Sequence, residues 1–471
     1  MSKKPTIDTP SKAYLEMLSD LELVTALMGG TDAMREAGQK YLPREPKESI
    51  AAYKNRLARS VLYNAFADTV QKLIGKPFSK PVNFLEDTPE QIKEWCNDVD
   101  LCGSNITTFC REVFEYGLTD GLVHLLVVLP LNDGAKTLAD EQQLKTRPYI
   151  VPVRAADLIS WRSELINGVR TLTQVRFREN TTEPDGEWGE KTVQRIRVLY
   201  PDRFELYELQ KKEWVIVDQG LISLGRIPLV TFYTGKICYM AAKPPLLDLA
   251  HLNVLHWQSS SDQEHILHFI RFPLLHGAGF AQDQKDIEIG PNRMIMSEDP
   301  QAKLTFVEHT GAAVDSGRQS IRDLELKMDA MGGQLLMQRS GDSTATAASL
   351  DTAKSHSALQ DMVRRMENAM QQAFILMALW AKLPADKAGG VNINEDFGLS
   401  LISGKDEDTL LKSRLSGELS RESFLTELKR RNVLRNELDV TEEIERIETE
   451  GRTDITDDNP DDEKSMTNAE R

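Results

Sequence analysis

Residues 245–273 read PLLDLAHLNVLHWQSSSDQEHILHFIRFP. Apolar side chains recur in this stretch at steps of three and four residues, the spacing of one helical face; they are Leu246, Leu249, Leu252, Leu255, Ile266, Phe269 and Ile270. Pro273 ends the pattern, because proline interrupts a helix. At 1.5 Å per residue, the roughly 25 residues from Leu246 to Ile270 span about 37 Å, more than most helices of a small domain. The stretch predicts a long packing helix.

A turn-rich insertion follows this helix, and a second helix is predicted from about Gly317 to Met337. Two helices that bracket a compact insertion indicate a stalk with a tip. We expect the stalk to pack through Leu249, Leu252, Leu255, Ile266 and Phe269.

The segments before and after the stalk indicate an α+β protein. A helix is predicted over Lys47–Gly75 and another over Ser104–Tyr116, followed by a buried strand at Leu122–Leu129. Alternating apolar residues then predict strands at 171–178, 192–200, 204–209 and 214–217, with a turn at Pro184, Asp185 and Gly186. The strongest helical pattern runs from Ser349 to Leu383, and short helices are expected at 406–415, 421–432 and 441–450, before an acidic tail from Gly451.

Composition excludes several classes of protein. The 471 residues are enough for two or more subdomains, and the four scattered cysteines match neither a disulfide framework nor a zinc motif. The net charge is −16, and residues 386–471 hold 23 acidic against 13 basic residues, which is −10 of that total. An acidic chain is poorly suited to bind DNA tightly, although an acidic channel wall suits a protein through which DNA only passes. The apolar runs are shorter than the about 20 residues of a membrane span, so we expect no membrane association.

Three segments carry a resemblance to a known family. They are 41–82, YLPREPKESIAAYKNRLARSVLYNAFADTVQKLIGKPFSKPV; 244–279, PPLLDLAHLNVLHWQSSSDQEHILHFIRFPLLHGAG; and 332–363, GGQLLMQRSGDSTATAASLDTAKSHSALQDMV. From about Tyr41 to Val440, and in matching order, the chain resembles portal proteins of tailed bacteriophages, specifically a subgroup long known only as a domain of unknown function.

The resemblance implies a portal fold: a ring of usually about twelve identical subunits around a DNA channel. It assigns residues 1–245 to an α+β wing, 246–271 and 317–337 to two stem helices, and 272–316 to an inserted clip. Residues 338–348 match the tunnel loop, 349–384 the long wing helix, and 385–471 a mainly helical crown with the acidic tail.

The same resemblance implies the function and the partners. The ring would stand at the capsid vertex of the virion after assembly in the host cytoplasm, and would conduct double-stranded DNA during packaging and ejection. The clip would meet the terminase and then the head-completion adaptor through surface residues such as Lys285, Arg293 and Lys303, while the wing would meet the capsid. The expected channel residues are those of the tunnel loop: Gln338, Arg339, Ser340, Gly341, Asp342, Ser343 and Thr344.

We expect no catalysis, no cofactor and no metal. The phosphate-binding string G-x-x-x-x-G-K-[ST] and the nucleophile elbow G-x-S-x-G do not occur in the sequence. Two alternatives stay open. One is a metal-dependent hydrolase that uses the histidines between His251 and His276, of which His265 and His268 are spaced to share a helix face. The other is a different head-tail connector component.

Overall fold

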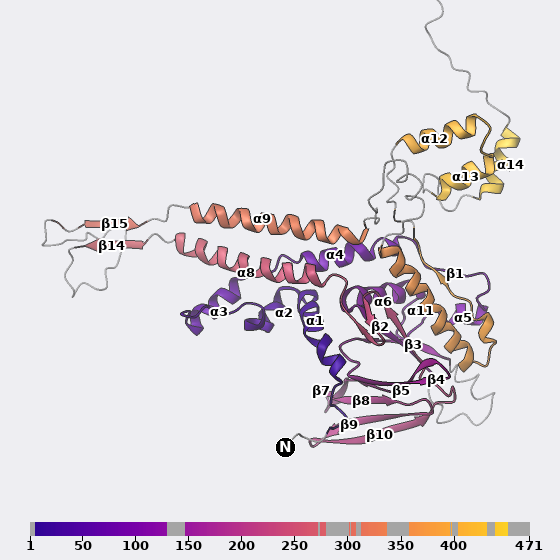
Figure 1. The fold of residues 1–471 in the computed structure, drawn as a ribbon, viewed down its shortest axis with the longest axis horizontal. Helices are drawn as coiled ribbons and strands as arrows, with labels where there is room; N and C mark the ends of the chain where they lie inside the picture. The colour runs from indigo at the N-terminus through magenta and orange to yellow at the C-terminus, as the bar shows by residue number, and fades with distance from the viewer. Residues whose placement is uncertain are drawn as a thin grey trace, which may run out of the picture. The chain divides into compact units, whose positions relative to one another are not determined.

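The computed structural model describes residues 5–129, 147–271, 274–278, 301, 303–307, 312–336, 358–395, 397, 404–430 and 439–450 (Figure 1). Helices and two larger sheets make it an α+β protein, as the sequence predicts. The chain divides into two compact units, Met1–Glu395 and Asp396–Arg471.

Five helices open the first unit: α1 (Lys12–Met28), α2 (Gly30–Ala37), η1 (Gly38–Lys40), α3 (Ile50–Arg59) and α4 (Ala65–Ile74). The single helix expected over Lys47–Gly75 is wrong, because residues 60–64 are not helical. Ser60 ends α3 with extended backbone (φ −67°, ψ 131°), and the Asn64 side chain caps α4 by accepting from the Ala67 N–H. The break lets α3 and α4 pack separately against the same later helix, α8 (Leu247–Ile270).

A three-stranded antiparallel sheet forms the centre of this unit. Its order is β11 (Leu229–Tyr233), β2 (Leu122–Val128), β3 (Tyr149–Arg154), so the strand predicted at 122–129 is confirmed. Helix α6 (Ile106–Asp120) leads into β2 through Gly121, whose φ is +84°. Helix α11 (Ala358–Trp380) packs on β11 and β2 through a buried methionine-rich stripe.

A larger antiparallel sheet packs against the first, in the order β10 (Glu213–Leu221), β9 (Arg203–Gln210), β8 (Arg195–Leu199), β5 (Val169–Arg178), β4 (Ser160–Ile166). Leu126 of β2 meets Leu172 and Val175 of β5 in the core between the sheets. The strand expected at 192–200 is divided at Gln194 between β8 and a separate hairpin of β6 (Thr181–Asp185) and β7 (Gly189–Val193). Gly186 turns that hairpin with φ +73°, as predicted.

Two long helices and a hairpin follow. Helix α8 lies alongside α9 (Ala312–Gly333), and the strands β14 (Leu274–Ala278) and β15 (Lys303–Val307) pair beyond the same end of both helices (Figure 1). A turn, η3 (Gln334–Leu336), ends α9. Helix α9 begins at Ala312 instead of Gly317, so the expected insertion 272–316 is too long at its end.

Small elements complete the first unit. They are η2 (Pro77–Ser79), β1 (Asn83–Phe84), α5 (Glu90–Trp95), β12 (Lys236–Cys238), β13 (Ala241–Ala242), η4 (Ala385–Lys387) and β16 (Val391–Asn392). Strand β16 pairs with β1, and the Gly390 N–H donates to Thr88 Oγ1 at 3.1 Å. Residues 385–395 therefore belong to the first unit, whereas the sequence assigned them to the C-terminal region.

The second unit contains α12 (Gly404–Leu415), α13 (Arg421–Arg430) and α14 (Val440–Glu450), which match the three short helices predicted there. Ser420 Oγ accepts from the Ser423 N–H at 3.0 Å, and Asp439 Oδ1 accepts from the Thr441 N–H at 2.8 Å, so both later helices have side-chain caps. The acidic tail lies outside the described residues. Among the helices described, none has the length and apolar character to cross a bilayer.

Candidate functional site: the helix pair α8 and α9

The predicted stalk residues do not form one packed face on α8. Leu249 is fully buried and Leu252 is half-buried, whereas Leu255 and Ile266 are 46% and 40% exposed. The side chain of Phe269 lies outside the described structure. Leu255 and Ile266 are therefore not packed within one subunit, and the predicted stalk packing at these two residues stays a prediction.

Half of the buried residues of α8 are polar. The buried residues are Leu247, Leu249, Ala250, Asn253, His256, Trp257, Ser261 and Gln263. Polar groups buried in this way must find hydrogen-bond partners, because an unpaired one costs free energy. The sequence does contain a signal for these buried polar residues, since Asn253 and Gln263 are uncharged amides inside a helical pattern, but their partners lie far away in the chain.

Asn253 joins α8 to the start of α4. Its Oδ1 accepts from the Phe66 N–H at 2.9 Å, and its Nδ2 donates to the Tyr63 carbonyl at 2.8 Å. The first turn of any helix leaves N–H groups without intrahelical partners. Asn253 is fully buried, so it satisfies one of these groups from a position nearly 190 residues later in the chain.

A buried ion pair between Glu48 and Arg56 contacts α8 through the Arg56 side chain. Arg56 donates from Nε and Nη2 to the two Glu48 carboxylate oxygens, each at 2.9 Å, and from Nη2 to the Pro43 carbonyl at 2.8 Å. Its Nη1 reaches Ser261 Oγ at 3.4 Å. The hydrogen bonds from Arg56 hold the pKa of Glu48 below its ordinary value, so this carboxylate stays charged although its side chain is only 7% exposed.

Helices α8 and α9 meet through polar contacts as well as apolar ones. His256 Nε2 lies 3.3 Å from Glu325 Oε1, and Gln263 Nε2 donates to the Val314 carbonyl at 3.0 Å. A Cβ at Gly317 would lie 2.1 Å from Gln263 Oε1, so glycine permits the close approach. Leu324 and Met328 supply the buried apolar face of α9.

The histidines of α8 do not gather at one point. His251 is exposed and His256 faces α9, whereas His265 and His268 line a small cavity of about 70 Å³ with Arg56, Arg59 and Arg271. Burial and the two neighbouring arginines 56 and 59 lower the pKa of His265. Within the described ranges, no three His, Cys, Asp or Glu side chains are grouped so as to hold a metal ion.

The hairpin of β14 and β15 carries one of the three residues that are predicted to contact a partner protein. Lys303 begins β15 and is exposed. Lys285 and Arg293 lie outside the described residues, as do the channel residues predicted from Gln338 to Thr344.

Comparison with known proteins places a match on this same region. A family described as "Domain of unknown function (DUF4055)" matches residues 245–381, which contain α8, the hairpin, α9 and α11. No curated protein matches the chain.

Solved structures give weaker likenesses. The neck of an empty gene transfer agent particle, computed with C6 symmetry, is 9% identical with a TM-score of 0.39, over 75% of this chain and 87% of that one. A chain from the virion of the native particle is 8% identical with a TM-score of 0.37, over 77% and 87%. A chain from the native neck, computed with C12 symmetry, is 10% identical with a TM-score of 0.39, over 84% and 98%. Because these TM-scores are below 0.5, the likenesses do not establish a shared fold.

Proposed function

We propose that the chain is a phage portal protein, a subunit of a ring that forms the DNA channel at the capsid vertex and joins head to tail. The observation that carries this proposal is the helix pair α8–α9 with a strand pair beyond its end. A portal stem and clip need this arrangement: two helices held side by side, with the connection between them built into a tip.

Exposed apolar side chains on the helix pair support assembly into a ring. Leu255 and Ile266 on α8 lie eleven residues apart, about three helical turns, so they share one face. Leu326 on α9 is 67% exposed. A neighbouring subunit would cover these groups, and a head-to-tail contact between unlike surfaces closes into a ring when the rotation between subunits allows it.

In this proposal three parts of the chain have a partner. Double-stranded DNA passes through the channel, and residues 338–344 approach it. The β14–β15 hairpin with Lys303 meets the terminase during packaging and the head-completion adaptor afterwards, and the sheets of the first unit meet the capsid. The ring itself performs no catalysis, so a separate motor supplies the energy for packaging.

The experiment is native mass spectrometry and negative-stain microscopy of the full chain. We expect closed rings of about twelve subunits. Leu255→Asp and Leu326→Asp should keep the wild-type circular dichroism spectrum but lose the rings, because a charge would lie in the subunit contact.

Leu165→Asp is the matched control, since Leu165 is 68% exposed on β4 and lies outside the helix pair. Its rings should persist. A wild-type chain that stays monomeric over a wide range of concentration and salt would refute the proposal. Rings that survive both stem substitutions would show that the helix pair is not the subunit contact.

A further inference from the structure

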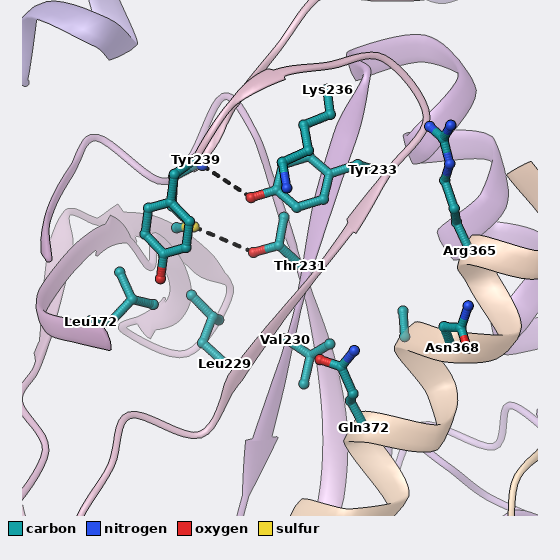
Figure 2. A pocket seen from close by; sticks show the side chains of 12 residues that line it. Leu172, Leu229, Val230, Thr231, Tyr233, Lys236, Tyr239, Arg365, Asn368 and Gln372 are labelled. Atoms are coloured by element: carbon teal, nitrogen blue, oxygen red, sulfur yellow. Dashed lines mark hydrogen bonds between the residues drawn. The ribbon is translucent and has the colours of Figure 1, made fainter. Parts of the chain in front are cut away.

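A cavity of about 570 Å³ lies beside β11 (Figure 2). Leu229, Thr231 and Tyr233 of β11 line it on one side, and Arg365, Asn368 and Gln372 of α11 line it on the other. Its size is within the range of ligand sites, about 300–1,000 Å³.

The cavity encloses an open strand edge. Strand β11 is the outer strand of its sheet, and none of the described strands pairs with its other side. The Val127 N–H donates to the Pro228 carbonyl at 2.9 Å and the Thr234 N–H donates to the Gly121 carbonyl at 3.0 Å, so the even-numbered residues of β11 bond to β2. In an antiparallel pair the intervening residues direct their N–H and C=O groups the other way. Thr231 and Tyr233 therefore present backbone donors and acceptors at the free edge.

The walls of the cavity come from both faces of the strand. Leu229, Thr231 and Tyr233 lie on the face that looks toward Leu172 and Tyr239, while Val230 lies on the opposite face toward α11. Figure 2 shows the two walls on opposite sides of β11. A groove that spans both faces of an edge has the shape to admit another extended chain.

The charge of the lining favours an acidic occupant. Lys236 and Arg365 both line the cavity, and none of its lining side chains is a carboxylate. The Lys236 ammonium lies 4.9 Å from the Tyr233 ring centroid, and Arg365 Nη1 donates to the Thr234 carbonyl at 3.5 Å. The two cations thus sit at the end of β11, and the side-chain amides of Asn368 and Gln372 add further donors.

We propose that this cavity is a docking site for an extended, acidic segment of a partner protein, which adds to the free edge of β11 as a fourth strand. Backbone hydrogen bonds to Thr231 and Tyr233 supply the pairing, and alternate side chains supply the selectivity. Acidic side chains face Lys236 and Arg365, and apolar ones pack on Leu172 and Leu229. This site is independent of the proposed ring contact.

The probe is a synthetic eight-residue peptide that alternates Val and Asp, with blocked ends, measured by fluorescence anisotropy on the full chain. We expect saturable binding, and slower amide hydrogen exchange at Thr231 and Tyr233 in the bound state. A Val–Lys peptide should bind at least about tenfold more weakly, because its charges repel Lys236 and Arg365. A Val–Asp peptide methylated on every backbone nitrogen should also lose affinity, since neither of its edges can then donate hydrogen bonds to β11.

The double variant Lys236→Glu with Arg365→Glu should bind the Val–Asp peptide at least about tenfold more weakly. The matched control Arg44→Glu with Lys54→Glu changes the same charge at exposed positions of another region and should bind as wild type does. The proposal is overturned if no binding occurs, if the methylated peptide binds equally well, or if exchange at Thr231 and Tyr233 is unchanged. Displacement of the peptide by a single-stranded DNA oligomer would equally overturn it, as the site would then be a general polyanion surface.

Discussion

Removal of the buried Arg56 guanidinium should loosen α3 from α8. In Arg56→Met the Glu48 carboxylate, only 7% exposed, loses both of its 2.9 Å hydrogen bonds from arginine. An unpaired charge left in such a site costs about 3–5 kcal/mol. The double variant Arg56→Met with Glu48→Gln should recover most of this loss, because the remaining side chain is neutral and can still accept from the Glu45 N–H.

The effect also has a defined pH dependence. Arg56 lowers the pKa of Glu48 in the folded state, so the pair's contribution is complete above the ordinary pKa of 4.5 and is lost as the pH falls through the lowered value. In Arg56→Met the carboxyl can relieve its penalty by protonation. The difference in stability between wild type and Arg56→Met should therefore shrink as the pH is lowered below about 5.

Hydrogen-exchange mass spectrometry measures the loss of stability segment by segment, which suits a chain of two units. At neutral pH, exchange of amides in α3 and in residues 258–262 should accelerate by about two to four orders of magnitude in Arg56→Met. Arg59→Met is the control, since Arg59 is exposed and its Nε donates to the Asn55 carbonyl at 3.2 Å. Unchanged exchange in Arg56→Met, or a double variant as unstable as the single one, would refute the reasoning.

Three further predictions test the fold. Asn253→Ala should destabilise the first unit by about 1–3 kcal/mol, because the Phe66 N–H and the Tyr63 carbonyl lose their partner, and an unchanged urea midpoint would contradict this. Burial lowers the pKa of His124 to about 3, so the imidazole binds a proton less well in the folded state than in the unfolded chain. Titration of His124 should therefore lower the free energy of unfolding by about 2 kcal/mol from pH 7 to pH 5. The variant His124→Gln should abolish that part of the pH dependence. In Gly121→Ala a Cβ would lie 2.7 Å from the Lys243 backbone at φ +84°, whereas at Gly168 (φ +80°) nothing lies within 4 Å; thermal melting should therefore show a much larger loss for Gly121→Ala than for Gly168→Ala.

Local patterns predicted the helices α6, α8, α9 and α11 and the strand β2. The stripe of Leu359, Met362, Met366, Met370, Ala373 and Met377 is buried along α11, as its helical spacing indicates. The hairpin turn at Gly186 and the three C-terminal helices also lie where the sequence places them. These features follow from residues close together in the chain, since helical and strand periodicity and turn chemistry act over a few positions.

The candidate site was harder to predict because its partners are distant in sequence. Within one subunit α8 buries Asn253, His256 and Ser261. Leu255 and Ile266, which the apolar pattern assigns to a packed face, stay exposed there and are left for the proposed subunit contact. A polar side chain can be buried only where another segment satisfies its hydrogen bonds. The Phe66 N–H, which donates to Asn253, lies far from Asn253 in the chain, and Arg56, which donates to Ser261, lies far from Ser261.

The sequence by itself therefore determined the α+β class, the two long helices with an insertion between them, and the resemblance that suggests a portal. Tertiary structure decided which face of α8 is buried, where the helix over residues 47–75 breaks, and that no strand in the described part of the chain pairs with the edge of β11 beside Lys236 and Arg365. The division has a physical cause: secondary structure depends on neighbours in the chain, whereas the burial of a polar group or the pairing of a strand edge depends on segments that only folding brings together.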